Sequence, residues 1–307
     1  PLPLDEARLS IEDGDTRIDR TILGAGTRVL TQEIPATKSA GVSLWVPVGS
    51  RDEGPRTAGS THFLEHLLFK GTNKRSALDI AVAFDSVGGE SNAETAREHT
   101  AYWARVRDAD LDMAIETLTD MVTDSRLDEE DFSMERGVIL DELAMGEDSP
   151  TDTVHDTFQL AVHGDRPIGR PVGGTPQAIR EVERADVWEH YQAHYGPSSL
   201  IVAAAGNVDH ESVCERVQAA LEGSPWDAGS AASPRPRRST TVTPIADHDK
   251  DITRRRDVTQ AHVIIGCEGL PATDTAGPTM SVLLSVLGGS MSSRLFQEVR
   301  EKRGLAY

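Results

Sequence analysis

The chain has 307 residues, with 31 Lys and Arg against 50 Asp and Glu, so its formal net charge is −19 and its length suits about two domains. A hydrophobic content of 38% is that of a folded protein, whereas the negative charge argues against a protein that coats nucleic acid or an anionic membrane. The presence of only two cysteines argues against a disulfide scaffold, and the absence of an apolar run near about 18 residues argues against a transmembrane helix. The N-terminus has no signal-peptide pattern, so we expect a cytoplasmic protein.

Hydropathy patterns over the first two thirds of the chain predict strands and helices in succession. Strand patterns, alternating or rich in β-branched residues, occur at 27–33, 41–49, 92–106 and 199–206. Helical spacing occurs at 60–69, 76–87, 108–123, 128–145, 179–195 and 211–221. Ser60 or Thr61 is expected to cap the first of these helices, which ends before Gly71. This mixture predicts the α+β class.

The composition changes near residue 222. Residues 223–244 are rich in Gly, Ser, Ala, Pro and Arg and have almost no apolar pattern, which is typical of an exposed linker. We therefore predict an N-terminal domain at 1–222 and a C-terminal domain at 245–307.

The two predicted domains share an order of elements. A strand, an acidic turn and an apolar helix at 40–72 recur from 261 onward, with a strand at 261–266 and a helix that begins near Thr275 or Pro278. Duplication of a whole α+β unit explains this repeat. Because the second copy ends at Tyr307, far short of the first copy's length, we expect the second domain to be truncated.

The segment 61–69 carries the strongest chemical signal. His62 and His66 are four residues apart, so they project from one face of the predicted helix. Two neutral imidazoles placed in this way can bind one metal ion, and histidine suits zinc. Glu65 lies beside them, where a general base could take a proton from metal-bound water. The order H-x-x-E-H is the inverzincin signature.

A cluster of surface charge is the competing interpretation of this segment. Against it, the polar groups interrupt an apolar helix that contains Phe63, Leu64 and Leu67. Burial of polar groups in such a helix is unfavourable unless they are paired or bound to a metal. The sequence therefore favours a metal site.

A catalytic zinc ion needs a third protein ligand and an open position. Glu135 and Glu142 are two turns apart on the helix predicted at 128–145, so they share a face. Several other acids on that helix are expected to be solvated. Periodicity alone does not choose among these carboxylates.

These segments resemble the pitrilysin-type zinc metallopeptidases, and most closely the mitochondrial processing peptidase β-subunit and its bacterial relatives. The resemblance rests on HFLEHLLFKGT at 62–72 and ERGVILDEL at 135–143. Further segments that fit lie at 88–95, 173–175, 206–209 and 287–307. It implies two homologous α/β-sandwich-like domains, each an antiparallel-rich sheet with helices on one side, that form a clamshell. The first would bear zinc, and the second, which lacks H-x-x-E-H, would hold substrate.

The resemblance also implies a role for each site residue. Glu142 would be the third ligand of one Zn²⁺ ion held by His62 and His66, and Glu65 would be the general base and acid. Glu135 would be a catalytic-site carboxylate that orients the histidines, as such partners commonly do. An ordinary helix salt bridge is the alternative role for Glu135.

By the same resemblance, the substrate is an extended peptide. Asn92 and Ala93 would lie on an edge strand that pairs with it, and Arg300 and Tyr307 would reach its carbonyl group from the second domain. A plain edge strand and a solvated helix face are the alternatives for these two pairs.

The sequence thus predicts a zinc-dependent endopeptidase that hydrolyses unfolded or short peptides. Its acidic surface would favour basic peptides, and family analogy implies a homodimer for the full-length protein. Two alternatives stay open. One is a non-catalytic subunit like a processing-peptidase partner or a respiratory-complex core protein, and the other is an interaction domain with a fortuitous motif.

Overall fold

The computed structural model describes residues 6–226, 229–236, 251–271 and 274–306. The chain divides into two compact units, Pro1–Pro236 with His248–His262 and Arg237–Asp247 with Val263–Tyr307. The predicted domain boundaries stay a prediction, because 237–244 of the predicted linker lies outside the described residues. The described parts of that linker are 223–226 and 229–236, and in the latter Arg235 N–H donates to the Ser198 carbonyl at 2.7 Å.

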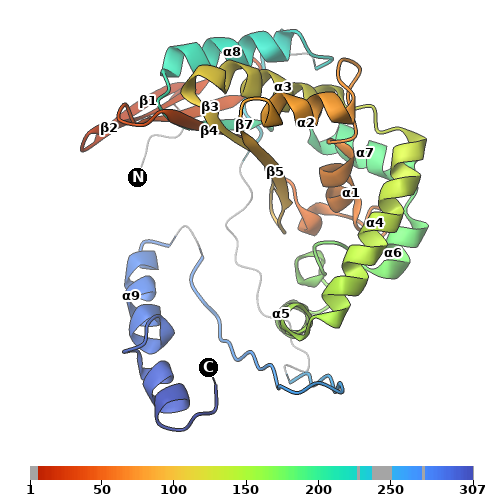
Figure 1. Cartoon of the computed structure of the whole chain (residues 1–307), viewed down its shortest axis with the longest axis vertical. Helices are drawn as coiled ribbons and strands as arrows, with labels where there is room; N and C mark the ends of the chain where they lie inside the picture. The colour runs from red at the N-terminus through yellow and green to blue at the C-terminus, as the bar shows by residue number, and fades with distance from the viewer. Residues whose placement is uncertain (1–5, 227–228, 237–250, 272–273, 307) are drawn as a thin grey trace. The chain divides into compact units, whose positions relative to one another are not determined.

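The first unit is built on a seven-stranded sheet with the strand order β1-β2-β3-β7-β4-β6-β5 (Figure 1). The strands are β1 (Arg8–Asp13), β2 (Thr16–Ile22), β3 (Arg28–Glu33), β4 (Ser39–Val46), β5 (Glu90–Thr95), β6 (Thr100–Arg107) and β7 (Ile201–Gly206). Only β3 and β7 pair in parallel, and all other neighbours are antiparallel. The predicted α+β class with an antiparallel-rich sheet is confirmed.

Helices cover one face of this sheet. The described helices are α1 (Ser60–Leu67), α2 (Ala77–Asp85), α3 (Leu111–Asp124), α4 (Glu129–Asp148), α5 (Pro150–His163), α6 (Pro176–Glu181), α7 (Arg184–His194), α8 (His210–Glu222) and α9 (Gly277–Gly288). Figure 1 shows α3 and α8 running along the sheet, where α3 contacts β4 and β6 and α8 contacts β3. Every second residue of β4 is buried beneath them, as the two-residue period of a strand requires.

The helix α1 packs against α4, α7 and the edge strand β5. Phe63 of α1 stacks on Phe132 of α4 with ring centroids 4.7 Å apart, and both side chains are fully buried. The register of α1 against α4 is fixed by this aromatic pair, because interlocking large side chains leaves few alternative packings.

The start of α1 differs from the expectation. Ser60 and Thr61 lie inside the helix, and the capping position is Gly59 with φ +91°. A side chain is disfavoured there, since a Cβ atom would also lie 2.4 Å from Ile179 Cδ1. The capping acceptor comes instead from Glu53, whose carboxylate accepts the Gly59 and Thr61 N–H groups at 2.7 and 2.8 Å.

The strand predicted at 261–266 is wrong. The segment has no regular structure, and Ile265 is 91% exposed. A strand needs a partner for its backbone groups, and the described residues supply none beside it. The predicted helix is present as α9 and is followed by a π-helical turn at Phe296–Glu301.

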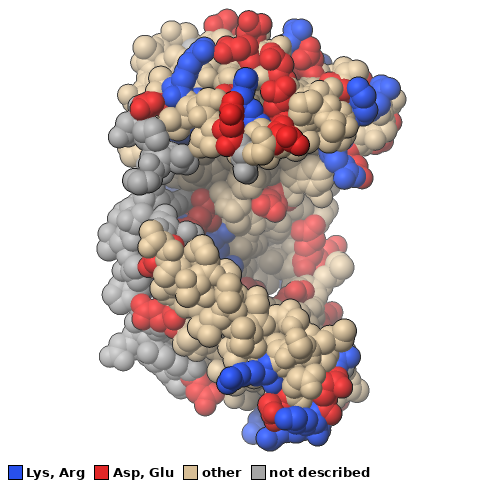
Figure 2. Space-filling view, turned by 90° about the vertical axis from the view of Figure 1, so that its left-hand side faces the viewer, with Lys and Arg blue, Asp and Glu red and all other residues tan. Residues whose placement is uncertain are grey.

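The helix α9 contains no Lys, Arg, Asp or Glu, so all its residues are tan in the colouring of Figure 2. Its exposed apolar side chains belong to Val282, Leu283, Leu284, Val286 and Leu287. Apolar residues all around a helix are typical of one that is covered on several sides. None of the described helices is long and apolar enough to cross a membrane.

The α1–α4 packing makes one prediction. Replacing Phe132 by Ala removes the ring that stacks on Phe63 and should lower the free energy of unfolding by about 3–5 kcal/mol. Met134→Ala is the matched control, because this side chain on the same helix is exposed, and it should change stability by less than about 0.5 kcal/mol. Urea unfolding followed by circular dichroism measures both. Equal stabilities for the two variants would contradict this account.

Candidate metal centre

Two helices bring three predicted metal ligands together. His62 and His66 lie on α1 and Glu142 lies on α4. The two histidine Nε2 atoms are 3.2 Å apart, and Glu142 Oε2 lies 3.6 Å from His62 Nε2 and 3.4 Å from His66 Nε2. Zinc bonds of about 2.0–2.1 Å at tetrahedral angles put ligand atoms about 3.3 Å apart. The three atoms therefore have the chemistry and the spacing that one zinc ion needs.

Glu135 contacts the nitrogen of His66 that does not face the other two ligands. One carboxylate oxygen is 2.9 Å from His66 Nδ1, and the other is 2.5 Å from Lys70 Nζ. The Glu135 side chain is only 3% exposed. Burial by itself raises the pKa of Glu135, but hydrogen bonds from Lys70 and His66 outweigh it and leave the pKa lowered. A charged carboxylate at Nδ1 favours the tautomer of His66 that carries its proton there, which leaves Nε2 free to bind a metal.

The buried Nδ1 atom of His62 has no hydrogen-bond partner among the described residues, whereas Nδ1 of His66 has Glu135. Burial, reinforced by the nearby His66 and opposed by Glu142, lowers the pKa of His62 to about 4. Its ring is therefore neutral at physiological pH, as a metal ligand must be. Gly173 packs against the ring, since a Cβ atom there would lie 3.3 Å from His62 Nδ1.

Glu65 lies on α1 near a buried pair of phenols. The hydroxyl groups of Tyr102, on β6, and Tyr195 are 3.1 Å apart. Burial chiefly raises the pKa of both tyrosines, and the Glu65 carboxylate acts in the same direction. Both phenols therefore stay protonated at physiological pH.

The edge strand β5 runs beside α1. It pairs only with β6 among the described strands, so its outer edge is available to another chain. Asn92 is exposed, and its side-chain oxygen accepts the N–H of Ala93 at 2.8 Å. The predicted pair Asn92 and Ala93 thus lies on a sheet edge near the three converging ligands.

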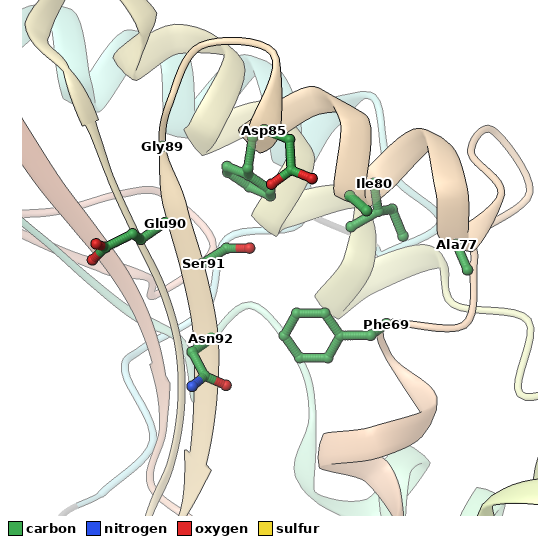
Figure 3. Close-up of a pocket in the computed structure, with 10 residues that line it drawn as sticks. Phe69, Ala77, Ile80, Asp85, Gly89, Glu90, Ser91 and Asn92 are labelled. Carbon is green, nitrogen blue, oxygen red and sulfur yellow. The ribbon is translucent and has the colours of Figure 1, made fainter.

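A pocket of about 590 Å³ opens between β5 and α2 (Figure 3). Its apolar wall comes from Phe69, which follows α1, and from Ile80 and Phe84 of α2. Ser91 and Asn92 of β5 lie across from Phe69 in Figure 3. The pocket therefore places an apolar wall opposite the polar residues Ser91 and Asn92 of β5.

The two residues predicted from the second domain are not tested by this geometry. The Arg300 guanidinium lies 4.8 Å from the centre of the Phe296 ring and 4.0 Å from a Glu301 carboxylate oxygen. Tyr307 lies outside the described residues. Both assignments stay predictions.

Sequence reasoning missed several supporting residues. Lys70 lies one helical turn after His66, so the four-residue spacing could have indicated it. Gly173 carries no such signal, because its contact with His62 joins segments far apart in the chain. Glu53 lies close in sequence to Gly59 and Thr61, but in a turn whose spacing follows no helical or strand period.

Comparison with known proteins gives two family matches that together span most of the chain. Residues 28–176 match insulinase (peptidase family M16), and residues 181–307 match the peptidase M16 inactive domain. An uncharacterized zinc protease of Streptomyces coelicolor is 51% identical over 297 residues, which is 96% of this chain and 64% of that protein. The chain therefore spans a little less than two thirds of this relative.

Solved structures share the fold. A protease from Helicobacter pylori superposes with a TM-score of 0.74 at 22% identity, covering 97% of this chain and 69% of that one. Pitrilysin superposes with a TM-score of 0.64 at 20% identity, covering 78% of this chain and 25% of that one.

The converging ligands predict the effect of Glu142→Gln. An amide is a much weaker zinc ligand than a carboxylate, so zinc affinity should fall at least about 100-fold. Asp141→Asn, at the exposed neighbouring position on α4, is the control and should bind zinc as the wild type does. Competition with a chromogenic chelator measures both affinities. Unchanged binding by Glu142→Gln would move the third ligand elsewhere.

Glu135→Gln tests the carboxylate that contacts His66 Nδ1. The amide keeps the shape of the side chain but loses the charge that orients His66, so zinc affinity should fall about 10- to 100-fold. Glu130→Gln, exposed on the same helix, should have no effect on the same chelator assay. Wild-type affinity in Glu135→Gln would assign Glu135 to an ordinary salt bridge.

Proposed function

Because the chain belongs to the insulinase-type peptidase family M16, the family predicted from the 62–72 segment, we propose that it is a zinc-dependent endopeptidase acting on unfolded or short peptides. The observation that carries this proposal is the convergence of His62, His66 and Glu142 on one point. Glu65 lies on the same short helix as both histidines.

Each residue has a chemical task in this proposal. A zinc ion held by the three ligands would polarise a peptide carbonyl and lower the pKa of water. Glu65 accepts the proton of the attacking water and then passes it to the leaving amine. A single carboxylate thus serves first as base and then as acid. Glu135 holds His66 in the orientation that binding requires.

We place the substrate along β5. An extended peptide would add to the outer edge of this strand at Asn92 and Ala93, with backbone hydrogen bonds that are independent of sequence. One side chain would enter the pocket beside Phe69, which predicts a preference for an apolar residue near the cleaved bond. Pairing along a strand edge favours extended peptides over folded proteins.

Finer features of the proposal rest on resemblance. Arg300 and Tyr307 would donate to the carbonyl oxygen of the cleaved bond, and the two domains would close on the substrate as a clamshell. The net charge of −19 would attract basic peptides. Likeness to the processing peptidase β-subunit and a homodimeric full-length protein belong to the same proposal.

A non-catalytic subunit is the competing function. Loss of any ligand would favour it, but His62, His66, Glu142 and the proposed base Glu65 are all present. Catalysis is therefore the better supported function of this site.

Glu65→Gln tests the proposal. The variant should bind zinc as the wild type does but hydrolyse a library of unfolded peptides at least about 1,000-fold more slowly, because it removes the base. Chelation should abolish wild-type hydrolysis and zinc should restore it. Glu129→Gln, exposed on α4, is the control for charge removal. A zinc-loaded wild type that cleaves no peptide would favour the non-catalytic subunit, and full turnover by Glu65→Gln would reject the assigned base.

A further inference from the structure

Glu53 is a buried acid outside the metal centre that contacts the helix bearing the histidines. The residue is 5% exposed. Its two carboxylate oxygens accept separate backbone N–H groups, from Gly59 at 2.7 Å and from Thr61 at 2.8 Å. These amides belong to the start of α1, where N–H groups have no partner within the helix. Thr61 directly precedes His62, so this contact lies one residue from the first imidazole.

The same short segment is bonded to the edge strand. Ser50 N–H donates to the Ala96 carbonyl at 3.2 Å and Arg51 N–H donates to the Arg97 carbonyl at 3.0 Å, both in the turn between β5 and β6. Gly49 allows this approach, since a Cβ atom there would lie 2.3 Å from the Ala96 oxygen. Residues 49–53 therefore form a short link between two elements. Ser50 and Arg51 are hydrogen-bonded to the turn that follows β5, and Glu53 is hydrogen-bonded to the start of α1.

Stability alone explains this carboxylate poorly. Burial raises the pKa of Glu53 to about 7, even though hydrogen bonds from Gly59 and Thr61 act against it. When it is charged, the acid therefore loses more by leaving water than it gains from its hydrogen bonds. Ordinary helix caps in this chain, such as Asp209 of α8, are exposed and carry no such penalty.

We propose that Glu53 is a positioning residue: by holding the Gly59 and Thr61 amides it sets the direction of the first turn of α1, and with it the His62 side chain, relative to the peptide-binding edge of β5. This inference rests on the proposed peptidase function. It assigns to Glu53 no contact with substrate or metal. Substitution of Glu53 is expected to affect catalysis more than peptide binding, because its carboxylate is hydrogen-bonded to the start of α1 and not to β5.

The test uses Glu53→Gln at pH 8, where the wild-type carboxylate is charged. The amide keeps the length of the side chain and one acceptor oxygen, but its NH₂ group cannot accept the second N–H. We expect kcat for an unfolded peptide to fall about tenfold or more with KM nearly unchanged, since small misplacements of catalytic groups slow the reaction strongly. We also expect a changed visible absorption spectrum of the cobalt-substituted protein, and faster hydrogen exchange at the amides of residues 59 and 61 in the metal-free protein.

Asp209→Asn is the matched control. Asp209 accepts the Ser212 N–H at 2.9 Å at the start of α8, so the variant also weakens one helix cap. It should leave kcat and the cobalt spectrum unchanged while lowering the melting temperature about as much as Glu53→Gln does. Glu53→Asp keeps the charge and should recover part of kcat.

Several outcomes would overturn the proposal. A Glu53→Gln variant with wild-type kcat and a wild-type cobalt spectrum would overturn it. The same holds if the melting temperature falls while kcat and the cobalt spectrum stay unchanged. Failure of both Glu53 variants to fold would assign the residue to folding instead. A wild type that binds zinc but cleaves nothing contradicts the peptidase function, and in that case hydrogen exchange of α1 still decides whether Glu53 orders the helix.

Discussion

The whole site depends on the packing of α1 against α4. A helix with two histidines one turn apart offers two metal ligands, and only the contact with α4 adds a third. The Phe63–Phe132 stack holds the two helices in one register, and Glu135 and Glu142 then project toward the histidines from the same side of α4. An apolar contact thus positions a polar centre, because close packing allows few alternative arrangements.

The two buried acids near α1 illustrate how surroundings decide charge. Glu135 and Glu53 are both removed from water, but Glu135 contacts the positively charged Lys70, whereas the hydrogen-bond donors to Glu53 are uncharged groups of Gly59 and Thr61. The pKa of Glu135 is accordingly lowered and that of Glu53 is raised to about 7. A cation compensates for lost hydration more fully than neutral donors do. The acid behind His66 is therefore reliably charged, and the acid that caps α1 is poised between two states at neutral pH.

Hydropathy periods and residue spacing predicted those features of the fold that depend on neighbours in the sequence. The strand at 27–33 and the helix at 128–145 follow from periodicity, and the histidine pair follows from four-residue spacing. Glu142 could not be separated from Glu135 by spacing, since they share a helix face. Their difference is tertiary: the Glu142 side chain is 47% exposed beside the histidines and that of Glu135 is 3% exposed behind them. The strand expected at 261–266 failed for the same reason, because pairing depends on a neighbour and not on the segment itself.

The charges on β5 bear on what can occupy its open edge. Glu90 and Glu94 are exposed on either side of Asn92. If two copies of this strand met antiparallel about Asn92, Glu90 of each would oppose Glu94 of the other, which makes two pairs of facing carboxylates. Like charges directly opposite one another disfavour such a ladder. The edge therefore resists self-association into continuous sheets.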